Sequence, residues 1–147
     1  TAKTEEVDKV LGLELGAESR GSGEAILVRD GEAVEGAASN LFLVMDGEIL
    51  TPPKDERILP GITRDLVVEL AHQHELPCRE TAIDREWLDR AEEIWVTSST
   101  KEIVPVVRLD GKPVGEGRPG KLWRRMVAYY QEYKQTFLLK QRGGVHL

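Results

Sequence analysis

The sequence predicts an α+β protein in which a mixed, mainly antiparallel sheet is flanked by helices. Asp-Gly dipeptides separate short apolar segments at residues 30–31, 46–47 and 110–111, which is a strong hairpin signal. Apolar residues at helical spacing follow Thr63 and again follow Lys121. A chain of 147 residues fits one ordinary domain and can bury a real core. We therefore expect one compact domain.

The expected first half is one helix followed by two hairpins. A helix is predicted from Glu5 to Ser19, where four apolar side chains can share a face: Val7, Val10, Leu11 and Leu15. Strands are expected at residues 25–29, 32–34, 40–45 and 48–51. The run from Asn40 to Met45 is nearly all apolar, which is typical of a strand covered on both faces.

The second half is expected to alternate helices with short strands. Thr63 to Glu75 is predicted to be a helix that ends before Pro77, with Ile62, Leu66, Val67, Leu70 and Ala71 on its apolar face. Strands are expected at residues 78–83, 93–97, 104–109 and 112–114, and Asp84 should cap a brief helix through Ala91. The last helix begins at Lys121, with Leu122, Met126, Tyr129, Tyr130 and Tyr133 on one face, and Gln141 to Leu147 should be loose.

Composition argues against several functional classes. The net charge of −6 disfavours nucleic-acid binding, because the phosphate backbone repels an acidic surface. No apolar run is long enough for a membrane span and no signal peptide opens the sequence. The single Cys78 cannot form an internal disulfide, which favours a cytoplasmic location. His72, His74 and His146 are scattered, so no metal site is expected.

Two segments carry groups suited to binding an anion. Gly61-Ile62-Thr63 follows a loop and opens a helix, whose first amides have no internal partners and carry partial positive charge. Ser98-Ser99-Thr100 places three hydroxyls after a buried strand, where they could complete a phosphate cup. Each segment also has an ordinary interpretation, as a capped helix and as a polar loop.

Two charged residues are candidates for chemistry. Glu35 precedes a run of small residues, and its carboxylate could pair with a protonated ring nitrogen of a flat ligand. Lys3 could form a Schiff base if its surroundings lower the pKa of its amine. Alternatively, Glu35 is a solvated turn residue and Lys3 a solvated terminal lysine.

Three segments, taken in order, resemble the fold type IV pyridoxal-phosphate enzymes. These segments are Glu35 to Phe42, Leu59 to Arg64 and Trp95 to Val106. That family includes D-amino acid aminotransferases, branched-chain aminotransferases and aminodeoxychorismate lyases. The resemblance runs from about Lys3 to the helix after Leu122. It implies that residues 1–147 form the single C-terminal cofactor-binding domain of this fold, and that the family's smaller N-terminal domain is absent from this chain.

The resemblance assigns roles around pyridoxal 5′-phosphate. Lys3 would form the Schiff base, Glu35 would keep the pyridine nitrogen protonated, and Leu59 would pack on the ring face. The cofactor phosphate would be bound by the remaining candidates: Gly61, Ile62, Thr63, Ser98 and Ser99.

The implied reaction is transamination of an amino acid with a 2-oxo acid acceptor, carried out by a homodimer. The Ser98-Ser99-Thr100 cluster before Lys101-Glu102-Ile103 is most similar to D-amino acid aminotransferases, so a D-amino acid such as D-alanine is the expected substrate. Branched-chain transamination and aminodeoxychorismate lyase activity remain alternatives. A non-catalytic fragment or scaffold domain is a third.

Overall fold

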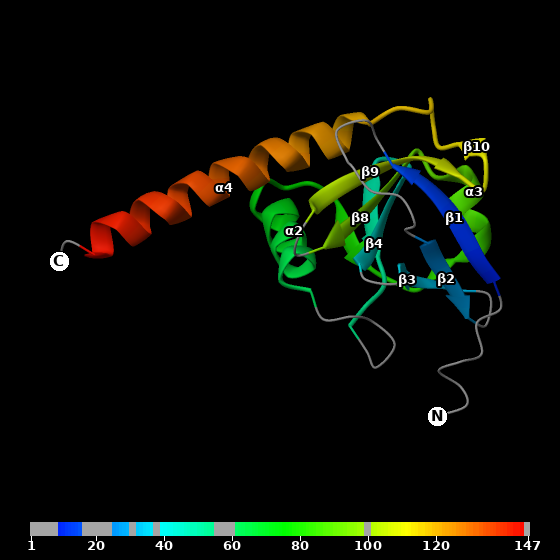
Figure 1. Cartoon of the computed structure of the whole chain (residues 1–147), viewed down its shortest axis with the longest axis horizontal. Coiled ribbons are helices and arrows are strands. Elements are labelled where there is room, and N and C mark those ends of the chain that lie inside the picture. Colours follow the sequence, from blue (N-terminus) through cyan, green and yellow to red (C-terminus); the bar gives the residue numbers. More distant parts are fainter. Residues whose placement is uncertain are drawn as a thin grey trace.

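The described part of the chain is one large sheet with helices packed on it. The computed structural model describes residues 9–15, 25–29, 32–36, 39–54, 61–98 and 101–145. Figure 1 shows their arrangement, in which the strands lie together at one end and α4 extends from them. The strands are β1 (Lys9–Leu15), β2 (Ala25–Arg29), β3 (Glu32–Gly36), β4 (Ser39–Met45), β5 (Glu48–Thr51), β6 (Cys78–Glu80), β7 (Ile83–Asp84), β8 (Glu93–Ser98), β9 (Glu102–Leu109) and β10 (Lys112–Pro113). The helices are α2 (Ile62–Gln73), α3 (Arg85–Arg90) and α4 (Lys121–Val145).

Six of the strands close into a ring. The order β4-β8-β9-β1-β2-β3 returns to β4 because β3 also pairs with β4. β5 extends β4 beyond the ring and carries β6, the one parallel neighbour among the pairs of described strands. The predicted α+β class with a mainly antiparallel sheet is confirmed, and ring closure is an addition to it.

The expected helix from Glu5 to Ser19 is wrong over its described part. Residues 9–15 form β1, which pairs antiparallel with β2 and with β9. Leu11, Leu13 and Leu15 recur at every second residue, which is the pattern of a strand. The same segment also has apolar residues at helical spacing, so its sequence is compatible with either structure. Pairing with β9, about a hundred residues further along the chain, decides between the two patterns.

The hairpin prediction is confirmed where the turns are described. Asp46 and Gly47 both have positive φ, at 52° and 75°, between β4 and β5. Asp110 and Gly111 have φ of 50° and 80° between β9 and β10. Two successive positive-φ residues make a turn whose twist matches that of antiparallel strands, which is why Asp-Gly is favoured there.

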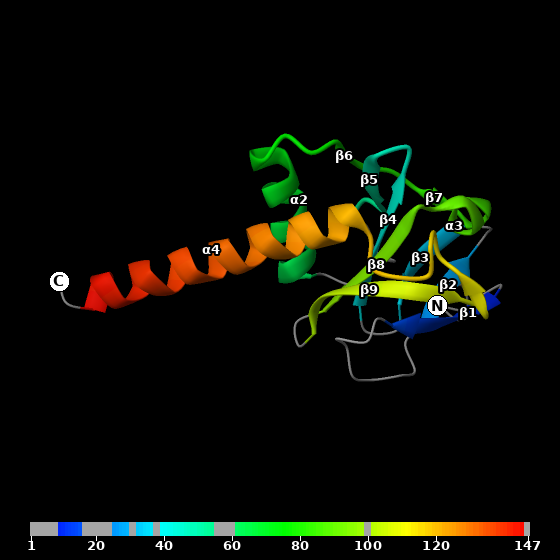
Figure 2. The same ribbon diagram turned by 90° about the horizontal axis from the view of Figure 1, so that it is seen from above.

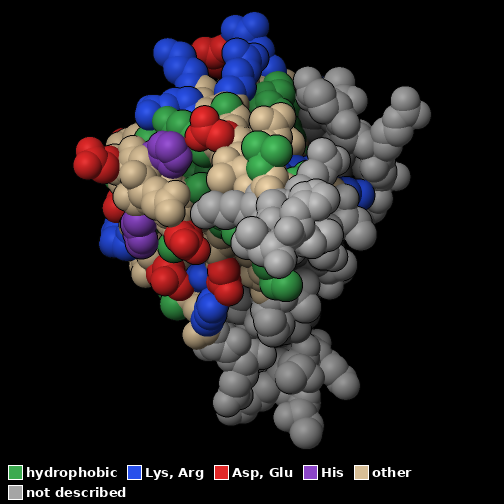
Figure 3. Space-filling view, turned by 90° about the vertical axis from the view of Figure 1, so that its left-hand side faces the viewer, with side chains coloured by type: hydrophobic (Ala, Val, Ile, Leu, Met, Phe, Trp, Pro, Cys, Tyr) green, Lys and Arg blue, Asp and Glu red, His purple; other side chains and the backbone are tan. Residues whose placement is uncertain are grey.

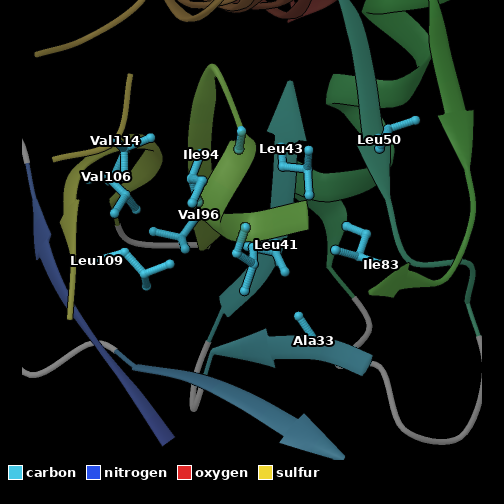
Figure 4. Packing of buried hydrophobic residues seen from close by; sticks show 13 residues of the cluster. Ala33, Leu41, Leu43, Leu50, Ile83, Ile94, Val96, Val106, Leu109 and Val114 are labelled. Carbon is cyan, nitrogen blue, oxygen red and sulfur yellow. The ribbon is translucent and has the colours of Figure 1, made fainter. Parts of the chain in front are cut away.

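One apolar cluster fills the interior of the ring. Figure 4 shows Leu41, Leu43, Ile94, Val96 and Val106 pointing into the space that the strands enclose. Leu41 and Leu43 have no exposed surface. They alternate along β4 with Phe42 and Val44, which belong to a second cluster on the other face. The continuous apolar run therefore serves two cores, as a strand covered on both faces requires.

The outer face of β4 and β8 is covered by α2 and α4. Phe42 and Trp95 lie with ring centroids 6.0 Å apart beneath these helices, and Met126 of α4 is fully buried against them. Figure 2 shows α4 running past α2 and away from the sheet. The helix continues to Val145, so the expectation of a loose segment from Gln141 is wrong at least that far. Tyr133 is 41% exposed and lies outside the buried face predicted for it.

The face of α2 that points away from the sheet is exposed to solvent. Figure 3 views the molecule from the end to which α4 points and shows histidine side chains (purple) at the surface near acidic side chains. Ile62 is 90% exposed, so its predicted place on the apolar face of α2 is wrong. The other predicted residues of that face are confirmed: Val67, Leu70 and Ala71 are buried, and Leu66 is partly buried against the same cluster. Among the described helices, none is long and apolar enough to cross a membrane.

The segment predicted as a single strand from Cys78 to Ile83 is two strands. β6 pairs with β5, whereas β7 pairs with β3 on a different part of the sheet. The change of partner brings α3 against the end of the ring, where Leu88 enters the interior cluster. Asp84 caps α3 as predicted, because its carboxylate accepts a hydrogen bond of 2.9 Å from the amide of Glu86.

Candidate functional site

The start of α2 presents backbone amides at the edge of the sheet. Gly61 is the N-cap residue in an extended conformation, and because it has no side chain it makes no side-chain capping bond to the helix. The first helical hydrogen bond runs from the Asp65 amide to the Gly61 carbonyl oxygen over 3.0 Å. The amides of the first turn precede that bond and carry the positive end of the helix dipole. They are suited to an anion.

Asn40 sets the position of this helix start. Its side chain is 3% exposed, and its amide oxygen lies directly against Gly61. A β-carbon at position 61 would overlap that oxygen and would also crowd the side chain of Arg64. Glycine is therefore required here by close approach and not by its backbone angles, since φ is −137°.

The strand register brings the other predicted segments to the same place. Glu35 of β3 lies opposite Asn40 of β4, and Asn40 in turn lies opposite Thr97 of β8. Ser98 follows Thr97 at the end of β8. The hydroxyl of Thr63 donates to the carbonyl oxygen of Ser98 over 3.3 Å, which joins α2 to that strand end. Three segments far apart in the sequence therefore meet at one edge of the ring.

One buried hydroxyl, that of Thr97, lies at this edge of the sheet. Thr97 is 1% exposed, and its Oγ1 has no hydrogen-bond partner among the residues that the structure describes. The Ser98 hydroxyl, next along β8, accepts a hydrogen bond of 3.0 Å from the Lys101 amide and so closes the turn into β9. An unpaired buried hydroxyl costs free energy. The site thus contains hydrogen-bonding capacity that the described side chains leave unused.

The buried side chain of Arg64 links the first turn of α2 to the chain segments beside it. Its side chain is 3% exposed, and one terminal nitrogen donates to the Pro52 carbonyl oxygen at 2.9 Å and to the Glu80 carboxylate at 2.6 Å. The other donates to Asp65 at 3.2 Å. Burial raises the pKa of the nearby Cys78 thiol to about 11; the Arg64 charge opposes this shift and the Glu80 charge adds to it. This environment keeps the thiol protonated at neutral pH.

The structure brings together four of the predicted site residues. Gly61, Ile62 and Thr63 form the start of α2, and Ser98 lies against Thr63. Ile62 can contribute only its backbone there, because its side chain faces solvent. Glu35 is placed by its backbone in β3, opposite Asn40. The other three candidates, Lys3, Leu59 and Ser99, lie outside the described residues.

Sequence reasoning missed Asn40 and Arg64 as residues that shape the site. Asn40 is the polar first residue of an otherwise apolar run, and such a residue usually marks the strand end that meets another element. Arg64 follows Thr63 directly, and nothing in its local pattern shows that it would be buried. Its partners, Pro52 and Glu80, are 12 and 16 residues away.

Comparison with known proteins is consistent with this fold and site. The amino-transferase class IV family model matches residues 1–109, which is most of the 147-residue chain, and the chain therefore belongs to that family. The D-alanine aminotransferase of Staphylococcus haemolyticus is 37% identical over 115 residues, which are 78% of this chain and 41% of the relative.

Solved structures give the same result. The branched-chain amino acid aminotransferase from Escherichia coli is 42% identical with a TM-score of 0.68, over 76% of this chain and 39% of that one. An aminotransferase from Brucella abortus, solved with bound cofactor PLP, is 30% identical with a TM-score of 0.70, over 80% of this chain and 41% of that one. This chain thus spans about two fifths of the length of these relatives.

Proposed function

We propose that this chain is the C-terminal, pyridoxal-phosphate-binding domain of an aminotransferase. The main observation behind this proposal is that the start of α2 contacts the ends of β4 and β8. Gly61 lies against Asn40, and Thr63 donates a hydrogen bond to Ser98. Membership of the class IV family and the cofactor bound to the Brucella abortus relative support the proposal. An N-terminal domain and a second subunit would complete the enzyme, which we expect to act as a cytoplasmic homodimer.

The residues present fit the phosphate of the cofactor. The amides at the start of α2 can donate to phosphate oxygens, and Gly61, which has no side chain, allows close packing beneath them. The Thr63 hydroxyl can donate as well, provided that it turns away from the Ser98 carbonyl oxygen. The backbone and hydroxyl of Ser98 lie beside it, and Ser99 would extend the cup.

The ring end of the cofactor is assigned to Glu35, Leu59 and Lys3. Glu35 would hold a proton on the pyridine nitrogen, and its place on β3 opposite Asn40 puts it one strand from the start of α2. Leu59 would pack on the ring face and exclude water. Lys3 would bind the cofactor covalently and carry the substrate α-proton. The bound cofactor would supply an electron sink that stabilises negative charge at the substrate α-carbon.

The preferred substrate is a D-amino acid such as D-alanine, with a 2-oxo acid as acceptor. Ser98-Ser99-Thr100 and the D-alanine aminotransferase relative support this choice. Branched-chain transamination is the second candidate, because the chain is also similar to the branched-chain enzyme from Escherichia coli. Product analysis of the full-length protein with D-alanine, L-leucine and aminodeoxychorismate separates these two reactions from lyase activity.

The first experiment adds pyridoxal 5′-phosphate to the chain and records its visible spectrum before and after borohydride reduction. Mass spectrometry then locates any reduced adduct. We expect one adduct, on Lys3, which is lost in Lys3→Ala. A folded protein that forms no adduct, both as this chain and in full-length form, would exclude cofactor binding. The result would then support a non-catalytic scaffold domain.

A further inference from the structure

The turn from β8 to β9 is held from two sides. On one side, Thr63 of α2 bonds to the Ser98 carbonyl oxygen. On the other, Glu102, which lies opposite Ser98 across the turn, is bound by α4. Lys134 donates to Glu102 Oε2 over 2.6 Å, and Gln131 donates to Oε1 over 3.4 Å. Ser98, the described residue of the proposed phosphate site on β8, is therefore linked to one helix directly and to the other through Glu102.

Glu102 has a backbone conformation that needs support. Its φ is +64°, in the left-handed region that residues with a side chain adopt at a cost of about 1–2 kcal/mol. Glu102 is the first residue of β9, so this angle sets the direction in which the chain leaves the turn. The contact with Lys134 acts on the residue where the turn is strained. The hydrogen bond to Glu102 also raises the pKa of Lys134, so the contact favours the charged amine.

The position of Lys134 is itself well determined. Met126 and Tyr130, about two turns and one turn before it, are 0% and 8% exposed, which fixes α4 on the sheet. Nearer the start of the helix, the Trp123 indole donates to the Ile103 carbonyl oxygen over 3.1 Å. α4 thus binds two consecutive residues of β9. Residues 121–145 lie beyond the segment that the family model matches, which ends at residue 109.

We propose that Glu102 and Lys134 are positioning residues through which α4 holds Ser98 in place and thereby sets the affinity of the proposed site for phosphate. This proposal rests on the proposed cofactor site. The side chains of Lys134 and Glu102 are 39% and 32% exposed, and such ion pairs are ordinarily of small value. This pair differs from an ordinary surface pair because it acts at a positive-φ residue that lies opposite Ser98 of the proposed phosphate site.

The test compares two probes on the full chain: pyridoxal 5′-phosphate and pyridoxal, which has the same ring without the phosphate. Lys134→Met keeps the length of the side chain and removes its charge. We expect it to raise the Kd for pyridoxal 5′-phosphate by about two- to fivefold, the range of a partly exposed ion pair, and to leave the Kd for pyridoxal unchanged. Glu102→Gly, which accepts the positive φ but removes the carboxylate, should have the same phosphate-specific effect.

Two further variants separate positioning from general stability. Arg118→Met removes an ion pair of similar length but greater exposure, Arg118 with Glu116 at 2.7 Å, in the loop before α4, and should change neither Kd. The reciprocal exchange Glu102→Lys with Lys134→Glu should restore most of the affinity that Lys134→Glu alone loses. Thermal denaturation of each variant verifies folding.

The outcomes distinguish the two proposals. If the wild type binds pyridoxal 5′-phosphate more tightly than pyridoxal but Lys134→Met matches Arg118→Met, the positioning role is wrong and the cofactor site stands. Equal weakening of both probes by Lys134→Met also overturns the positioning role. If the wild type does not distinguish the probes, the phosphate site is wrong and the positioning role fails with it.

Discussion

The backbone of Gly61 lies against the side-chain amide oxygen of Asn40 so closely that a β-carbon on Gly61 would overlap it. This contact joins the start of α2 to β4 through the Asn40 side chain, which reaches the backbone because Gly61 has no side chain of its own. Because Asn40 also pairs with Glu35 and Thr97 in the sheet, the contact fixes the helix start relative to three strands.

Gly61→Ala should therefore shift the start of α2. We expect the free energy of unfolding to fall by about 1–3 kcal/mol, as is typical of overpacking, and the affinity for pyridoxal 5′-phosphate to fall with it. Urea denaturation and cofactor titration measure the two effects. In the Asn40→Ala background the added methyl group should cost less, and a full cost there would show that Asn40 is not the obstacle.

Thr97→Val should leave the protein at least as stable as the wild type. The buried Thr97 hydroxyl has no partner among the described residues, so its removal saves a desolvation cost of about 1 kcal/mol while the shape is kept. Thr51 is the matched control, since it is equally buried but donates to the Leu41 carbonyl oxygen at 2.6 Å. Thr51→Val should lose about 1–2 kcal/mol in urea denaturation. A similar loss in both variants would show that Thr97 has a partner.

Glu93 should contribute strongly to the attachment of α4. Its carboxylate accepts hydrogen bonds from the amides of Leu122 and Trp123, at 3.0 and 2.9 Å, and from the Trp95 indole at 2.9 Å. We expect Glu93→Ala to cost about 2–4 kcal/mol, because two helix amides lose a charged acceptor. The neighbouring Glu92 is exposed, and among the described residues its carboxylate accepts from the turn amides of Asp46 and Gly47. Glu92→Ala should cost under about 1 kcal/mol by the same measurement.

Cys78 should react slowly with alkylating agents in the folded protein. Burial raises the pKa of its thiol from 9.0 to about 11, so at pH 8 the thiolate fraction is about a hundredfold lower than in an unshifted thiol. The iodoacetamide rate should rise about tenfold per pH unit until the pH approaches 11. The urea-unfolded chain, whose only thiol is Cys78, supplies the reference rate. Equal rates in the two states would contradict the raised pKa.

The same shift has a consequence for stability. The unfolded thiol ionises at lower pH than the folded thiol, so unfolding releases a proton between about pH 9 and pH 11. The stabilising contribution of the neutral thiol is complete below pH 9 and is lost as pH rises through that window. Comparison of the wild type with Cys78→Ala across this range isolates the effect.

Local sequence determined the parts of the fold that depend on local physics. The Asp-Gly turns and the apolar run of β4 were predicted, because turn geometry and two-sided burial leave a mark in a few consecutive residues. The segment around Leu11 was wrongly predicted as helix, because its partner β9 is distant in the sequence. Ring closure was not predicted for the same reason.

Some features of the candidate site could also be predicted from a single segment, whereas others depend on residues that are distant in the sequence. The helix start at Gly61-Ile62-Thr63 was predicted from its segment, and its contact with Ser98 places two predicted segments together. The roles of Asn40 and Arg64 depend on which side chains lie above or beside them after folding. Spacing within a segment holds no information on such neighbours.

The ring has a kinetic consequence. β1 joins β9 through the pairs Leu13 with Leu109 and Leu15 with Val106, which lie more than ninety residues apart. Loop closure over such a distance is slow, so sheet assembly should be limited by the arrival of β1. Until then the edge of β9 is open to pairing with another chain, which is a route to aggregation. Refolding at low protein concentration should therefore raise the yield of folded protein. Conditions in which β1 pairs with β9 early should do the same.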